Sequence, residues 1–281
     1  MEEILASSIQ SGFAVAVDAL GNAYVTGSTY SNQASFPVKD GPSTIHQGDS
    51  DAFVAKVQAD GSDLAYCGYI GGGDYDDGSG IAVDASGSAF ITGTTASTEA
   101  TFPVRIGPDM SHNGGTEELH EDAFVARVAA NGASLDYCGY IGGAADDQGG
   151  GIAVDAAGNA FVTGLSYSTE ATFPVLIGPD LSHNGGSDAF VAKVRAGGAT
   201  LTCCGYIGGA GLDGGGDIAV DKAGNAYVVG GTQSTKDTFP VRVGPDLSDN
   251  GGWDIFVAKI SCDDFPWPIF LPAILEGGKK K

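Results

Sequence analysis

The chain is poor in basic residues, and this shortage excludes one large class of partner. It carries 13 Lys and Arg against 35 Asp and Glu, so its formal net charge is −22 over 281 residues. A negative field of that size repels the phosphates of nucleic acids and the anionic headgroups of membranes. We therefore expect no nucleic-acid partner, and we expect cations rather than anions among the ligands.

Long apolar runs are absent as well. No stretch of about 18 consecutive apolar residues occurs, so we expect no membrane-spanning helix. Residues 1–4 do not combine basic residues with a following apolar core, and they therefore predict no signal peptide. On this evidence, a cytosolic protein and a secreted protein whose signal has been removed are both open.

Short signatures of catalysis are also missing. The chain has no Gly-x-Ser-x-Gly elbow, no phosphate-binding loop and no His-Glu-x-x-His motif, which are typical of serine hydrolases, nucleotide-binding proteins and zinc proteases. It has no Cys-x-x-Cys pair either, which argues against zinc ribbons and c-type haem. We therefore predict a protein that is not an enzyme, and a carbohydrate-active enzyme with paired acids is the least favoured class.

What the chain does contain is glycine, 46 residues of it, and a long internal repeat. A repeat of this length determines the architecture of a fold. An Ala-Val-Asp step recurs at intervals of 66, 71 and 66 residues, at Asp18, Asp84, Asp155 and Asp221. Shared motifs follow each step: Phe-Pro-Val at Phe36, Phe102, Phe173 and Phe239, Phe-Val-Ala at Phe53, Phe124, Phe190 and Phe256, and, in three units, Cys-Gly-Tyr-Ile-Gly-Gly at Cys67, Cys138 and Cys204.

Each unit has the pattern of four short strands separated by turns. In the third unit we expect strands at residues 152–154, 161–163, 189–194 and 201–207, where β-branched and aromatic residues gather between turn residues. The sequence therefore predicts an all-β fold, a β-propeller of four four-stranded antiparallel blades, with repeats near 11–79, 80–149, 150–215 and 216–262. A β-solenoid is the alternative, although its coils are normally shorter and its strands parallel.

The repeated motifs resemble a known family. The frame Ile-Ala-Val-Asp-x-x-Gly-Asn-Ala-Tyr-Val-Thr-Gly, then Phe-Pro-Val, Asp-Ala-Phe-Val-Ala-Lys and Tyr-Cys-Gly-Tyr-Ile-Gly-Gly, is similar to the bacterial β-propeller repeat called SBBP, roughly over residues 12–260. This resemblance implies a secreted or cell-surface protein, so the expected location is extracellular or at the cell surface. The family name implies seven blades, whereas this chain carries four copies of the repeat.

The two ends of the chain bear on how the last blade is completed. The fourth unit lacks the Cys-Gly-Tyr-Ile-Gly-Gly strand, and a strand within residues 1–10 is one candidate to replace it and close the ring. The tail, residues 263–281, offers a second candidate in the apolar stretch from Pro268 to Leu275, whose prolines favour an edge position. If this tail strand is spare, it can pair with a second copy of the chain; the alternative is that it packs on its own blade.

Three loops before the third strand carry Gly-Pro-Asp-x-Ser-x-Asn-Gly-Gly and are candidate calcium sites. Oxygen-bearing side chains at positions 1, 3 and 5, Gly at 6 and an acid at 9 resemble the start of a calcium loop. The acid that such loops carry at position 12 is absent, and an Asx turn is the alternative. The candidate metal ligands are Asp109, Ser111, Asn113 and Glu117, then Asp180, Ser182, Asn184 and Asp188, then Asp246, Ser248, Asn250 and Asp254.

The other recurring polar residues and the cysteines are expected to have mainly structural roles. Acidic turns at residues 74–77, 146–147 and 213 are interpreted as capping turns or, alternatively, as cation sites, and the Asp of each Ala-Val-Asp step as the centre of a turn. The cysteines at the repeated position are expected to be small buried hydrophobic residues. Cys203 and Cys262 depart from the repeat, and a disulfide between them is an alternative that an oxidising compartment permits.

Three classes of function follow, in order of preference. The first is a secreted or cell-surface structural module that self-associates by exchange of an end strand. The second is a binding module for a glycan or a protein, with rim loops stiffened by calcium. The third is an enzyme. A spare C-terminal strand favours the first class, and rim aromatics such as Tyr30, Tyr75, Tyr167 and Trp253 favour the second.

Overall fold

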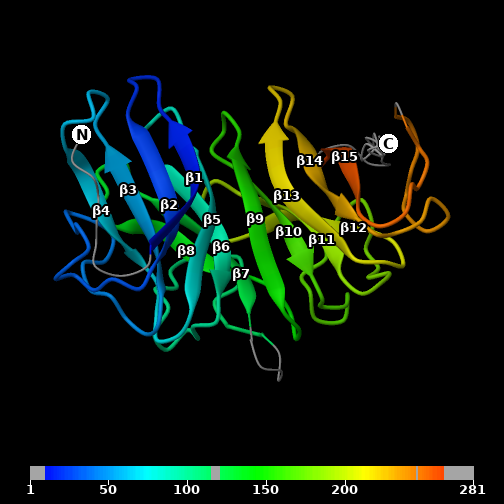
Figure 1. Cartoon of the computed structure of the whole chain (residues 1–281), viewed down its shortest axis with the longest axis horizontal. Helices are drawn as coiled ribbons and strands as arrows, with labels where there is room; N and C mark the ends of the chain where they lie inside the picture. The colour runs from blue at the N-terminus through cyan, green and yellow to red at the C-terminus, as the bar shows by residue number, and fades with distance from the viewer. Residues whose placement is uncertain (1–9, 115–120, 245, 263–281) are drawn as a thin grey trace, which may run out of the picture.

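The computed structural model of the chain describes residues 10–114, 121–244 and 246–262. Within these ranges it contains 15 strands and no helix, and hence no helix long enough to cross a membrane. The strands form four antiparallel sheets that lie side by side like the blades of a propeller, as Figure 1 shows. The prediction of an all-β, propeller-like fold is therefore confirmed.

The strands of each sheet follow one another in chain order, and we call the sheets blades 1 to 4. Blade 1 consists of β1 (Gln10–Val17), β2 (Ala23–Thr29), β3 (Asp51–Val57) and β4 (Leu64–Ile70). Blade 2 consists of β5 (Asp76–Val83), β6 (Ala89–Thr95), β7 (Asp122–Val128) and β8 (Leu135–Ile141). Blade 3 consists of β9 (Asp147–Val154), β10 (Ala160–Ser166), β11 (Asp188–Val194) and β12 (Leu201–Ile207). Blade 4 consists of β13 (Asp213–Val220), β14 (Asn225–Thr232) and β15 (Asp254–Ser261).

The Asp of each Ala-Val-Asp step organises the turn between the first two strands of its blade. One oxygen of Asp18 accepts the backbone N–H groups of Leu20 and Asn22 at 2.9 and 3.0 Å, and the other accepts the Asn22 side-chain amide at 2.8 Å. The hydrogen bond from the Asn22 side-chain amide is the main reason that the pKa of Asp18 falls to about 2. Asp155 and Asp221 repeat the pattern, so the expected turn role is confirmed.

The long loop between the second and third strands lies along the outer edge of its blade. In blade 2, Arg105 and Cys138 exchange two backbone hydrogen bonds of 2.7 Å, which adds a short rung beyond β8. Gly107 and Gly139 approach each other so closely there that a Cβ atom on either would overlap the backbone of the other. The loop residues that make the repeat unusually long therefore cover the outer strand of the blade.

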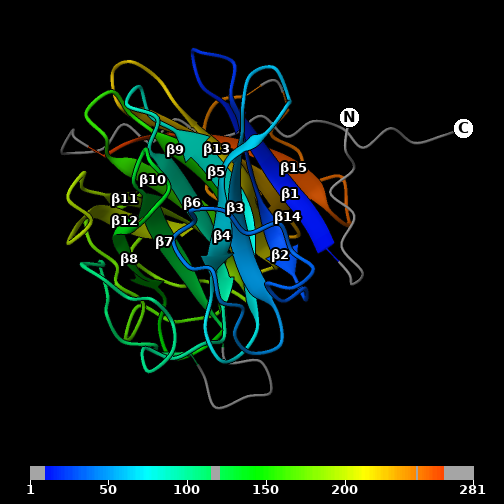
Figure 2. The same cartoon turned by 90° about the vertical axis from the view of Figure 1, so that its left-hand side faces the viewer.

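Three of the four hydrophobic clusters lie between consecutive blades, and the fourth lies within blade 1. Strand β5 packs across β1, β2 and β3, and β9 and β13 pack in the same way on the blades before them. The clusters at these boundaries join residues of consecutive blades, for example Tyr24 and Val54 of blade 1 with Ile81 and Phe124 of blade 2. Figure 2, seen from the side of blade 1, shows the blades one behind the other.

Blade 4 is described in three of its four predicted strands. In the described part of the chain it has three, because the sequence after Ser261 no longer follows the repeat and no Cys-Gly-Tyr-Ile strand comes after β15. Both segments expected to complete this blade, residues 1–9 and the stretch from Pro268 to Leu275, lie outside the described residues. β15 therefore has a partner strand, β14, on one side, and no described strand pairs with its other edge.

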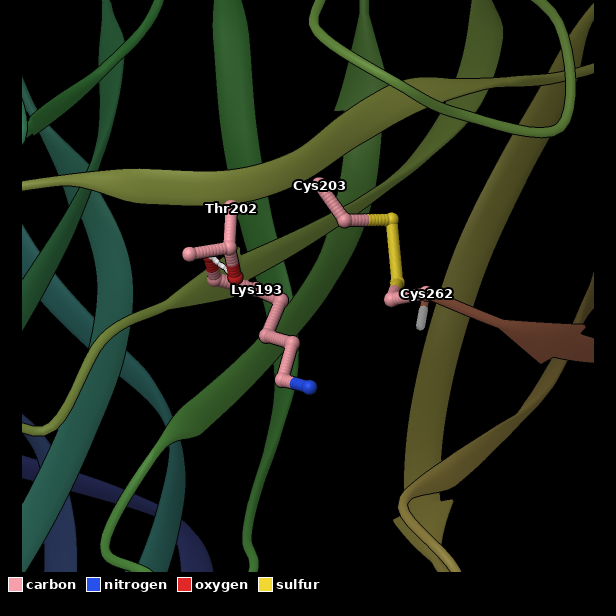
Figure 3. The surroundings of a disulfide bond; sticks show 4 residues. All are labelled: Lys193, Thr202, Cys203 and Cys262. Atoms are coloured by element: carbon pink, nitrogen blue, oxygen red, sulfur yellow. Dashed lines mark hydrogen bonds between the residues drawn. A yellow bond between two sulfur atoms is a disulfide. The ribbon is translucent and has the colours of Figure 1, made fainter. Parts of the chain in front are cut away.

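A disulfide ties blade 4 to blade 3. Cys203 on β12 is bonded to Cys262, which follows β15 directly, with their Cα atoms 5.7 Å apart (Figure 3). In blades 1 and 2 the position of Cys203 is held by Tyr66 and Tyr137, which lie against turns of the following blade. The disulfide that the sequence left as an alternative is therefore present. The cysteines at the repeated position, Cys67, Cys138 and Cys204, are buried and free, as expected.

Candidate functional site

The loops proposed to bind calcium form Asx turns. In blade 3, one oxygen of Asp180 accepts the backbone N–H of Ser182 at 2.9 Å, and the other accepts the side-chain amide of Asn184 at 2.9 Å. The same amide also donates to the Ser182 carbonyl at 2.9 Å. Both carboxylate oxygens of Asp180 are thus engaged by donors of the loop itself.

The equivalent loops of blades 2 and 4 follow the same plan. In blade 2, Asp109 accepts the backbone N–H of Ser111 and the amide of Asn113, at 2.9 and 2.7 Å. In blade 4 the turn around Asp246 also closes, since its carboxylate accepts the Ser248 N–H at 2.9 Å and Asn250 donates to the Ser248 carbonyl at 3.3 Å. Glu117 lies outside the described residues. Calcium stays a prediction for these loops.

The ninth position of the loops in blades 3 and 4 has a different environment from the turn. Asp188 is fully buried at the start of β11, where one oxygen accepts the backbone N–H of Asn184 at 2.9 Å. Asp254 accepts the N–H of Asn250 in the same way, at 3.0 Å. The predicted ligand sets are therefore divided into an exposed turn and a buried carboxylate beneath it. Among the described residues, no group of three or more His, Cys, Asp or Glu is placed to hold a metal ion.

Buried aspartates recur in pairs at the boundaries between blades. Asp122 of β7 lies close enough to Asp147 of β9 that its pKa responds to that charge, and the backbone N–H of Asp147 donates to the carbonyl of Glu121 at 2.8 Å. One oxygen of each of these two aspartates has no hydrogen-bond partner among the described residues. Burial, followed by the charge of Asp147, raises the pKa of Asp122 to about 8. Asp51 with Asp76 and Asp188 with Asp213 repeat the arrangement.

A pocket opens where blades 1, 2 and 3 meet. It has a volume of about 430 Å³ and combines aromatic, acidic and amide side chains from three blades. One wall is Phe13, which occupies a bulge in β1, and the neighbouring Tyr75 lies with its ring centroid 6.5 Å from that of Tyr30. The lining residues are Phe13, Tyr75, Asp77, Ser79, Thr94, Glu121, Gln148 and Gly149.

Two carboxylates determine the electrostatics of this pocket. Glu121 is almost fully buried and accepts a hydrogen bond of 2.6 Å from the amide of Gln148. Burial raises the pKa of Glu121, and the nearby charges of Asp146 and Asp77 raise it further. One oxygen of Asp77 is shielded from solvent and has no hydrogen-bond partner among the described residues. The pocket therefore presents acceptors to a cation or to the hydroxyl groups of a ligand.

Sequence reasoning singled out the acidic turn that contains Asp77 but not Glu121. The signal was nevertheless present, because Glu121 breaks the repeat. The equivalent positions in the other blades hold Ser50, Ser187 and Trp253, each immediately before the Asp that begins the third strand. The acidic residue in blade 2, where blades 1 and 3 share Ser, marks a position at which that blade differs in chemistry from them.

Comparisons with known proteins bear on the fold and the family. The family model described as SBBP, beta-propeller repeat, matches residues 6–33 and 137–170, so the resemblance seen in the sequence is confirmed at these two segments. No curated protein matches the chain. A crystal structure of a protein of unknown function from Dyadobacter fermentans DSM 18053 is similar over 96% of this chain and 84% of that chain, at 11% identity and a TM-score of 0.37.

Proposed function

We propose that the chain is a structural module without enzymatic activity, that it acts outside the cell or on its surface, and that it self-associates through the edge of blade 4. The observation that carries the proposal is the edge of β15 that pairs with no described strand. The equivalent strands β3, β7 and β11 each pair with a further strand, β4, β8 and β12, on the side where β15 has no described partner. An edge of this kind binds an extended segment through main-chain hydrogen bonds.

The disulfide supports the proposed location. Disulfides persist in secreted and surface proteins and are rare in the reducing cytosol. The Cys203–Cys262 bond joins two cysteines that break the repeat, at the point where blade 4 departs from the pattern of the others. The absence of enzymatic activity is supported by two of the recurring sets of Asp residues, represented by Asp18 and Asp180, because their carboxylates are engaged in turns.

The proposal predicts that removing the tail removes the self-association. The full chain is expected to form oligomers, and a chain ending at Asp264 is expected to be monomeric, because the apolar stretch from Pro268 to Leu275 is the proposed partner of the β15 edge. Light scattering coupled to size-exclusion chromatography, at several protein concentrations, measures this. A matched control ends after Leu275 and so removes only the Gly- and Lys-rich end. Unchanged oligomers after truncation at Asp264 would contradict exchange of the tail strand.

A second candidate function is that of a binding module for glycans, and the pocket between blades 1, 2 and 3 favours it. Its aromatic rings and acceptor oxygens are the groups that sugar recognition uses. Replacing Glu121 with Ser, the residue of blades 1 and 3, is expected to remove binding of oligosaccharides on a glycan array while leaving the fold intact. An unchanged pattern of bound oligosaccharides for Glu121→Ser would contradict glycan binding in this pocket.

Calcium belongs to this second candidate and has its own test. If the Asx loops hold calcium, the ion stabilises the folded chain by about 2.7 kcal/mol at a concentration one hundred times its dissociation constant. The expected result is a higher melting temperature in calcium than in a chelator, and a smaller difference in Asp180→Ala. Equal melting temperatures in both buffers would leave the loops as turns held by hydrogen bonds alone.

A further inference from the structure

We propose that copies of the chain dock end to end, with the open face of blade 4 in one copy packed on the open face of blade 1 in the next. This inference rests on the proposed assembly role but assigns it to a different surface, the flat faces of the end blades instead of the β15 edge. We call the side of a blade that meets the preceding blade its front face, and the side that meets the following blade its back face.

The repeated contact inside the chain shows what such a surface binds. At the first boundary, the back face of blade 1 contributes Tyr24 and Val54, and the front face of blade 2 contributes Ile81 and Phe124. The second and third boundaries use equivalent residues in the same register. The front faces of blades 2, 3 and 4 are thus each covered by the back face of the preceding blade.

Blade 1 has a front face that no described residue covers in this way. Val15 on β1 is 65% exposed, whereas the residues at its position in blades 2, 3 and 4, Ile81, Ile152 and Ile218, are only 8%, 6% and 6% exposed. The side chains are similar in size and all are apolar, so the difference comes from the missing neighbour. Burial of a side chain of this type removes apolar surface from water and so stabilises a contact.

The same face carries an apolar groove. It has a volume of about 260 Å³ and is lined mainly by Val25, Phe36, Phe53, Ala55 and Cys67. The equivalent residues of blade 2, among them Phe124 and Cys138, belong to the cluster that also contains Tyr24 of blade 1. The groove on blade 1 is therefore lined by the same kinds of side chain that, in blade 2, pack in the boundary with the preceding blade.

Blade 4 has the complementary open surface. Ile255 on β15 is 47% exposed, whereas Ala52, Ala123 and Ala189 at its position in the other blades are completely buried. Val229 on β14 is 40% exposed and takes the place of a buried threonine, Thr26 in blade 1. The back face of blade 4 thus has larger and more apolar side chains at two positions than the back faces that the chain covers internally.

A second copy of the chain is the occupant that fits both surfaces. Blades 1 and 4 lie at opposite ends of the row of blades in Figure 1, and the extensive contacts between described blades join only consecutive ones. A back face and a front face from two copies reproduce the boundary that the chain already forms three times. The contact is heterologous, so it gives a closed ring if the blades turn through a suitable angle and a filament otherwise.

The test uses two single variants of the full chain and their mixture. Val15→Asp on the front face of blade 1 and Ile255→Asp on the back face of blade 4 each place a charge in the proposed contact and leave the monomer folded, since both side chains are exposed in it. Each is expected to weaken self-association by more than about 100-fold in sedimentation velocity, because an unpaired charge is costly to bury. Leu20→Asp is the control, an exposed apolar residue in the β1–β2 turn.

The mixture distinguishes this contact from other modes of assembly. Val15→Asp retains the face of blade 4 and Ile255→Asp retains the face of blade 1, so equal amounts are expected to form one-to-one dimers that cannot extend. Self-association of the wild type should strengthen with added salt, which screens the repulsion between two chains of charge −22.

The outcomes separate this inference from the proposed function. Oligomers that persist in Val15→Asp but disappear on truncation at Asp264 overturn the face contact and support the β15 edge. Oligomers that disappear in Val15→Asp but persist after truncation at Asp264 support the face contact and contradict exchange of the tail. A wild-type chain that is monomeric at every concentration overturns both, and residues of the same chain then cover the open faces.

Discussion

Reduction of the Cys203–Cys262 disulfide is expected to lower the free energy of unfolding by about 4 kcal/mol. The bond closes a loop of 59 residues, and cross-linking a loop of that length lowers the entropy of the unfolded chain by roughly this amount. It also joins blade 4, whose extensive contacts with described blades are with blade 3, to the rest of the row. Urea unfolding with and without a reductant measures the effect, and blade 4 is expected to unfold first in the reduced protein.

The variant Cys203→Ser supplies the control for this measurement. It is expected to be as unstable as the reduced wild type and to show no response to reductant, because the remaining cysteines of the repeat are buried and free. Equal stability of the oxidised and reduced wild type would show that blade 4 is held by its apolar contacts with blade 3 alone.

Replacement of Asp122 with Asn is expected to stabilise the protein at high pH. In the folded state burial raises the pKa of Asp122 to about 8, whereas an unfolded chain has an Asp pKa of about 3.9. The protonated carboxyl is therefore favoured by folding, and its contribution is complete below about pH 4 and is lost as the pH rises towards 8. Asn keeps the size of the side chain and never acquires a charge, so the variant avoids this loss.

The expected gain in stability differs between Asp122 and Asp51. The four-unit difference in pKa corresponds to at most about 5 kcal/mol, so a gain of about 2–5 kcal/mol at pH 8 and little change at pH 4 are expected in denaturant unfolding. Asp51→Asn is the matched variant, with a smaller gain expected because the pKa of Asp51 is raised to about 7, mainly by burial. A loss of stability that appears only when calcium is present would instead assign a metal to the aspartate pair.

The sequence predicted the blades well because their information is local and repeated four times. Strands such as β11 and β12 are apolar and β-branched segments bounded by glycine-rich turns, and each predicted copy supported the others. The role of Asp18 in its turn was equally local, since its hydrogen-bond partners are within six residues. The fourth strand predicted for blade 4 lies outside the described residues, at the point where the sequence itself departs from the repeat.

The sites between blades were harder to predict because they depend on residues far apart in the chain. Asp122 meets Asp147 only once two sheets are packed together, and no spacing rule links a third strand to the first strand of the next blade. Glu121 reaches Gln148 across the same boundary. The open faces could not be predicted from the sequence either. Val15 and Ile81 occupy matching positions in the repeat and differ only in whether a described blade covers them.

The restriction of packing to consecutive blades has a consequence for how this protein changes over evolutionary time. Each boundary is a copy of the one before it, so duplication or deletion of one whole repeat leaves every other boundary intact. The stability of a linear array of repeats is likewise a sum of terms from single repeats and from neighbouring pairs. Blade number is then free to vary between related genes by recombination within the repeats. Residues that break the repeat, such as Glu121 and Cys203, record which copies have since diverged.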